Sequence, residues 1–135
     1  MLKSSLPITR PVRIAADFSA AEIVDVDFTL HDLFMACARN GERLIQGKTI
    51  RGCRIQGPAV LLASNGVTFT DVNFGDSRGE MGNLLTRSLG AKAIGSIPMR
   101  DCAFVSCEFH GVGFTGDDAF LEQMQQITGT PRPYA

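Results

Sequence analysis

The sequence predicts a mainly β protein in which residues 48–116 form a small right-handed parallel β-helix, a solenoid of units about five residues long. A large apolar residue recurs every five positions at Phe104, Phe109 and Phe114, and a smaller apolar residue lies two positions before each. This period matches neither the 3.6 residues of a helical turn nor the two-residue repeat of a strand. Glycine recurs at unit ends, where a corner needs a positive φ or has no room for a Cβ.

Three separated stretches share this frame. They are residues 48–62, 67–76 and 97–116. In each unit we expect the central Phe or Ile and the residue two before it to face the core. Ile50 and Phe69 are 19 positions apart, close to one turn of a four-sided coil, so Ile50 is expected to lie under Phe69. The same spacing predicts that Ile55 lies under Phe74.

Residues 75–95 do not fit the frame and are expected to form an insertion, a glycine-rich loop with a short helix over 83–89. Glycine-rich loops can bind phosphate, but no Gly-Lys-Ser/Thr follows here, so a simple excursion is favoured. Its apolar residues predict a flap buried against its own coil or against a second subunit. The expected interface residues are Met81, Leu84, Leu85 and Leu89.

A helix is expected at the C-terminal end, over residues 117–128. An open solenoid end exposes strand edges and apolar core, so it needs a cap. Asp117 and Asp118 can begin this helix, and its apolar residues form one stripe.

The N-terminal region, residues 12–41, carries two patterns. A five-residue spacing of apolar residues favours extended units, whereas the spacing from Leu30 onward is helical. We combine the two and expect extended units over about 12–28 and a helix over about 30–39, with Thr29 as its N-cap and Asn40-Gly41 as its terminator.

Three runs carry a resemblance to known proteins. They are Gly-Pro-Ala-Val-Leu at 57–61, Val-x-Phe-x-x-x-x-Phe at 67–74 and Cys-x-Phe-x-x-Cys-x-Phe at 102–109. With them the chain resembles pentapeptide-repeat proteins, and more closely a set of short uncharacterised bacterial right-handed parallel β-helix proteins. The resemblance covers about half the chain. It implies a scaffold rather than a reaction, although the units here are not contiguous.

Length, charge and cysteine content restrict the number of domains, the binding partners and the compartment that we expect. The 135 residues are the length of one domain, so 1–135 is expected to be a single domain. A formal charge of −1 gives no general attraction for nucleic acid or anionic lipid. The sequence predicts neither a signal peptide nor a membrane helix, and the spacing of the four cysteines is not typical of a disulfide framework. The cytoplasm is therefore the expected compartment.

Cys102 and Cys107 are the candidate pair for a zinc site. Four residues separate them, which is the upper end of the spacing in zinc sites, and no second close pair follows. Both occupy the small inward position of the five-residue frame, as Cys53 does. We therefore interpret these thiols as compact core residues and assign no metal or cofactor. No catalytic motif is present either, and no catalytic residue is assigned.

Arg100, Glu108 and His110 form the candidate ligand-binding set, because these titratable residues occupy outward positions of neighbouring units. A solvated face explains them equally well.

Three functions compete. The leading hypothesis is a non-enzymatic scaffold or protein-interaction module that binds a second copy or another protein, and neither nucleic acid nor membrane. The second is a small-molecule or carbohydrate-binding protein, or an enzyme, with a groove near the 75–95 insertion. The third, which the resemblance to pentapeptide-repeat proteins implies, is a DNA mimic that binds topoisomerases; the near-neutral charge of this chain is unfavourable for it.

Overall fold

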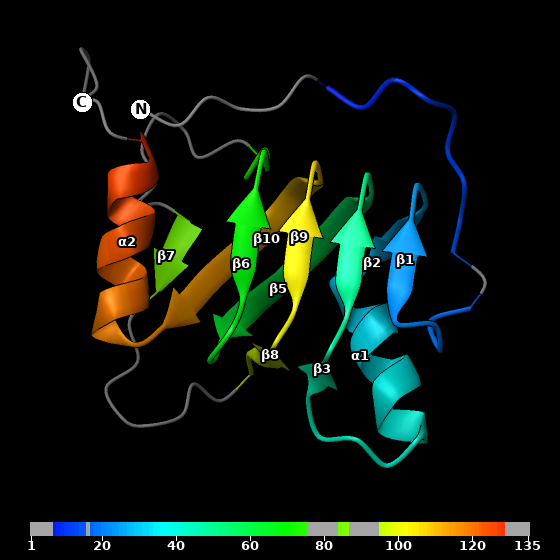
Figure 1. Cartoon of the computed structure of the whole chain (residues 1–135), viewed down its shortest axis with the longest axis horizontal. Helices are drawn as coiled ribbons and strands as arrows, with labels where there is room; N and C mark the ends of the chain where they lie inside the picture. Colours follow the sequence, from blue (N-terminus) through cyan, green and yellow to red (C-terminus); the bar gives the residue numbers. More distant parts are fainter. Residues whose placement is uncertain (1–6, 16, 76–83, 87–94, 129–135) are drawn as a thin grey trace.

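Parallel strands and two helices make up the computed structural model, which describes residues 7–15, 17–75, 84–86 and 95–128 (Figure 1). The strands are β1 (Glu22–Val24), β2 (Asp27–Thr29), β3 (Ile45–Gln46), β4 (Thr49–Arg51), β5 (Arg54–Ala63), β6 (Thr68–Thr70), β7 (Leu85–Thr86), β8 (Ile97–Arg100), β9 (Ala103–Val105) and β10 (Glu108–Gly116). The helices are α1 (Leu30–Arg39) and α2 (Asp118–Thr128). Neither described helix has the length and hydropathy needed to cross a bilayer.

The strands divide between two separate sheets, so the prediction of a single β-helix over 48–116 is wrong. One sheet has four strands in the order β1-β4-β9-β6, and the other has six, in the order β3-β8-β5-β10-β7 with β2 beside β5. The turns between the five-residue units explain why the strands divide between two sheets. Gly52 and Ser106 have φ angles of 66° and 53°, and at each of them the chain leaves the four-stranded sheet and enters the six-stranded one. The predicted corners therefore separate two sheets.

The predicted stacking order is also wrong. Phe104 of β9 is in register with Ile50 on one side and with Phe69 on the other, so β9 lies between β4 and β6. The Phe69 and Phe104 rings stack with centroids 5.3 Å apart and planes 8° apart. A spacing of 19 residues suggested direct contact between Ile50 and Phe69, but a later unit of the same pattern occupies the position between them.

The second predicted pair fails in the same way. Ile55 is in register with Phe109, and the Phe74 and Phe109 rings stack with centroids 6.1 Å apart. β10 thus lies beside β5, and Phe109 takes the place that the spacing predicts for Phe74.

The inward positions of the five-residue frame are confirmed over residues 102–114, whereas in the predicted unit 58–62 Pro58 is exposed and Leu61 is the fully buried residue. Phe104, Phe109 and Phe114 are fully buried, and so are the thiols of Cys53 and Cys107. These side chains belong to one apolar cluster to which both sheets contribute, and Figure 1 shows the sheet of β6 and β9 in front of the sheet of β5 and β10. The core therefore fills the space between the sheets.

Both predicted helices are present. α1 begins where the Thr29 hydroxyl accepts the backbone N–H of Asp32 at 3.0 Å, and it ends at Asn40. α2 begins where Asp117 Oδ1 accepts the backbone N–H of Phe120 at 2.8 Å. α2 packs against β10, so it covers that end of the two sheets.

The helix expected over 83–89 is contradicted where the structure describes the segment. Leu85–Thr86 form strand β7, in parallel register with Phe114 and Thr115 of β10. Pairing with β10 satisfies backbone groups that a short helix would leave open at its ends. Met81 and Leu89 lie outside the described residues, whereas Leu84 packs against the core of its own chain.

Candidate functional site

The structure brings together two of the three predicted ligand-binding residues. Glu108 and His110 lie two positions apart on β10, and Glu108 Oε1 is 3.0 Å from His110 Nε2. Glu108 is nevertheless only 5% exposed. Arg100 lies elsewhere, on β8, where its Nη2 donates to Gln46 Oε1 at 2.9 Å across the β3–β8 pair. The described contacts of these three residues therefore do not bring them together in one groove.

Strand register explains why Glu108 is buried. Arg54 of β5 pairs with Asp27 of β2 on one side and with Glu108 of β10 on the other. Acidic, basic and acidic side chains thus alternate across three adjacent parallel strands. We call Asp27, Arg54 and Glu108 the charge ladder.

Asp27 lies at the centre of the polar contacts. Its Oδ1 accepts from Arg54 Nε at 2.8 Å and from Arg10 Nη2 at 3.0 Å, and its Oδ2 accepts from the same two guanidinium groups at 3.1 Å each. Burial of Asp27 opposes its charge, but the hydrogen bonds from Arg54 and Arg10 outweigh that effect and hold the pKa of the carboxyl well below its usual range.

An N-terminal strap, residues 8–15, covers the charge ladder. Arg54 Nη2 donates to the Arg10 carbonyl at 2.9 Å, the Arg13 N–H donates to Asp27 Oδ2 at 2.8 Å, and the Ile8 N–H donates to the Glu108 carboxylate. The ladder thus binds the protein's own backbone. These charges fasten the strap and are not presented to a ligand.

The cysteines have no reactive character in this fold. Cys107 Sγ lies 3.2 Å from the Ile50 carbonyl, and burial raises the pKa of this thiol to about 12. Burial also raises the pKa of Cys53 and of Cys102. Thiols with such pKa values are protonated at neutral pH and are poor nucleophiles. The described part of the chain contains no cluster of three or more metal-ligating side chains.

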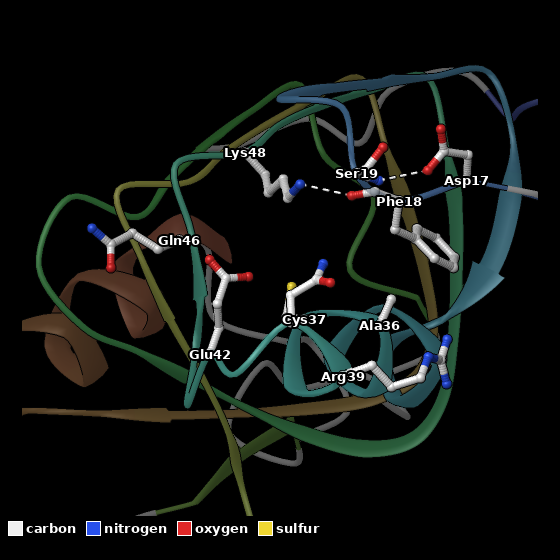
Figure 2. Close-up of a pocket in the computed structure, with 10 residues that line it drawn as sticks. Asp17, Phe18, Ser19, Ala36, Cys37, Arg39, Glu42, Gln46 and Lys48 are labelled. Atoms are coloured by element: carbon white, nitrogen blue, oxygen red, sulfur yellow. Dashed lines mark hydrogen bonds between the residues drawn. The ribbon is translucent and has the colours of Figure 1, made fainter.

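A cavity of about 440 Å³ lies beside the C-terminal end of α1, and no motif in the sequence pointed to it. Figure 2 shows Asp17, Phe18 and Ser19 on one side of the cavity and Glu42 and Gln46 on the other, with the Cys37 side chain between them. Lys48 joins the two walls, because its Nζ donates to the Phe18 carbonyl at 2.7 Å and to the Ala20 carbonyl at 2.9 Å.

The lining of the cavity carries both signs of charge. Its acidic residues are Asp17 and Glu42, and its basic residues are Arg39 and Lys48. Asp17 Oδ1 accepts the Ser19 N–H at 2.8 Å, so this carboxylate closes its own turn. The cavity can hold a small polar molecule.

Comparison with family models, with curated proteins and with solved structures gave no match. The resemblance to pentapeptide-repeat and short β-helix proteins therefore stays a prediction.

Proposed function

We propose that this protein is a non-enzymatic interaction module that self-associates at the end of the molecule where β1 lies. One observation carries the proposal. In the described part of the chain, the exposed large apolar side chains are Val12 (71%), Ile14 (72%), Val24 (42%) and Met35 (38%). They belong to the strap, β1 and α1, which lie at the same end in Figure 1. We call these four residues the β1-end patch.

The opposite end is covered. α2 buries Leu121 and Met124, and its Phe120 ring lies 6.4 Å from the Phe69 ring of β6. β1 and β6 are the two edge strands of the four-stranded sheet. An exposed edge strand is a template for pairing with another chain, and β1 is the edge strand that lies beside the patch.

A second copy of the chain is the partner that fits this end. A two-fold interface brings the same patch of both subunits together, so the patch must complement itself. Apolar side chains meet this condition, and so does a strand edge, which offers both N–H and C=O groups. The exposed pair Arg51–Glu22, 3.4 Å apart on β4 and β1, places both charges beside the patch.

The strength of association can be bounded from this patch. Full burial of an apolar side chain contributes ~1.5–3 kcal/mol, and association itself costs ~4–15 kcal/mol. The four partly exposed side chains on each copy give a gain of the same order as this cost, so association is expected to be weak and to depend on protein concentration.

Light scattering over a concentration series tests the proposal. The wild-type protein is expected to pass from monomer to dimer as its concentration is raised. Val24→Lys, which places a charge in the patch, is expected to hold it monomeric. Thr70→Lys is the matched control, because Thr70 is exposed on β6, the other edge strand of the same sheet. A wild-type protein that is monomeric at millimolar concentration, or Val24→Lys and Thr70→Lys variants that dimerise equally, would contradict the proposal.

A further inference from the structure

We propose that the surface beneath the N-terminal strap is a docking site for an extended segment of a partner protein that carries arginine followed by proline. In this structure the chain fills the site with its own Arg10 and Pro11. While the strap is docked, the charge ladder is covered, so a partner segment must displace the strap in order to bind. The inference does not depend on self-association.

Arg10 occupies a pocket whose hydrogen-bond acceptors lie at two neighbouring turns, the one between β1 and β2 and the one between β4 and β5. Its Nη1 and Nη2 donate to the two carboxylate oxygens of Asp27, at 3.1 Å and 3.0 Å. Nη2 also donates to the carbonyls of Val26 and Gly52, at 3.1 Å each. A planar guanidinium pairs with a carboxylate through two parallel bonds, which an ammonium group cannot reproduce. The pocket therefore selects arginine.

The rest of the strap is recognised through its backbone. The charge ladder contacts the N–H of Ile8, the carbonyl of Arg10 and the N–H of Arg13. Contacts of this kind require an extended segment and leave the side chains at those positions unspecified. Pro11 favours the required shape, because the residue before a proline is biased toward extended backbone. An arginine-proline pair within an extended segment is therefore the chemistry that the site recognises.

Apolar burial contributes little to holding the strap in place. Val12 and Ile14 are 71% and 72% exposed, and Ala15 is the described strap residue that packs against the apolar cluster. A β-bridge between Ile14 and Asp27 joins the strap to β2. In addition, Arg10 Nε is buried without a hydrogen-bond partner among the described residues, and an unpaired buried donor weakens binding. Another segment can therefore compete for the same polar contacts.

The space beneath the strap is not filled by the strap itself. A cavity of about 570 Å³ lies between residues 8–10 and the turns of the two sheets. Besides Arg10, the charged residues in its lining are Asp25 and Asp71, and both are acidic. A basic partner segment therefore meets complementary charge on both sides of the arginine pocket.

The test uses a fluorescently labelled peptide with the sequence of residues 7–15 and the full chain with Arg10→Ala, which empties the pocket and keeps the ladder. Fluorescence polarisation is expected to show binding about tenfold tighter to Arg10→Ala than to the wild type, in which the tethered strap competes at an effective concentration on the order of millimolar. A peptide with neutral citrulline in place of Arg10 is expected to bind Arg10→Ala about tenfold more weakly. Citrulline in place of Arg13 is the peptide control and leaves the affinity unchanged. Absence of binding to Arg10→Ala, or equal binding of the two citrulline peptides, would overturn the inference.

Two further variants of the full chain complete the design. Arg13→Ala removes an exposed arginine from the same strap and keeps Arg10 in its pocket, so it is expected to bind the peptide as weakly as the wild type. Arg10→Lys keeps a positive charge beside Asp27 without the paired contacts, so its affinity is expected to lie between those of the wild type and Arg10→Ala. The dispersion of the amide spectra verifies that each variant is folded.

The position of the peptide and the identity of its natural source are tested on the same samples. Peptide binding is expected to shift the backbone amides of Asp27 and Gly52, and shifts confined to other regions would overturn the inference. Equal peptide affinity of the Arg10→Ala and Arg13→Ala chains would contradict it as well. If light scattering shows that the peptide dissociates wild-type dimers, the occupant is the strap of a second copy, and the inferred partner protein is wrong.

Discussion

Replacing Asp27 by Asn removes a charge from the charge ladder while keeping the shape of the side chain. The carboxylate accepts five hydrogen bonds, two from Arg10, two from Arg54 and one from the Arg13 N–H. Its side chain is 7% exposed and each arginine side chain is 18% exposed. In the variant two guanidinium groups remain in place opposite an amide whose NH₂ cannot accept from them.

The expected cost follows from this burial. Removing one member of a buried ion pair destabilises a protein by ~3–5 kcal/mol, and the partial exposure of the arginines favours the lower end of that range. We expect Asp27→Asn to lower the free energy of unfolding in urea by about 3 kcal/mol. Glu22→Gln provides the comparison, because it breaks an ion pair that is 48% and 56% exposed and is expected to cost less than about 1 kcal/mol. Equal losses in the two variants would refute the assignment of Asp27 as the fastening point of the strap.

Acid titration checks the same residue in the wild-type protein. The folded-state pKa of Asp27 lies below the ordinary carboxyl value of 3.8. The stabilisation by Asp27 is therefore fully present above that value and is lost as the pH falls from there toward the folded-state pKa. Asp27→Asn is expected to flatten this part of the plot of unfolding free energy against pH. An unchanged acid dependence would mean that other carboxyl groups control it.

Two further predictions concern the core. Phe104→Ala is expected to lower the free energy of unfolding by ~3–5 kcal/mol, because the ring is fully buried between Ile50 and Phe69. Chemical denaturation measures this loss, and a value below about 1 kcal/mol would argue against the position of β9 between β4 and β6. Cys107 is expected to resist a thiol reagent at pH 8 until the protein unfolds, because the side chain is buried and burial raises its pKa to about 12. Peptide mass spectrometry locates the labelled cysteines, and rapid labelling of Cys107 in the native protein would contradict its burial.

Part of the candidate site could be read from the sequence and part could not. Glu108 and His110 are two residues apart, and the two-residue repeat of a strand places both on one side, so their contact follows from local spacing. Asp27 and Arg54 meet only because β2 and β5 align in register. The cavity beside α1 likewise joins residues 17–19 to residues 42–48, and no local pattern connects these segments.

The sequence by itself determined most of the side chains that face the core, although not those of the unit 58–62, and where the two helices begin. These are local properties, since a five-residue repeat selects the inward positions and Thr29 and Asp117 cap the helices within one turn. Tertiary structure decided the order of the strands and their division into two sheets. Units of one repeat pattern are nearly interchangeable as neighbours, so spacing could not show that β9 lies between β4 and β6. Ring stacking and parallel pairing across the whole core select that order.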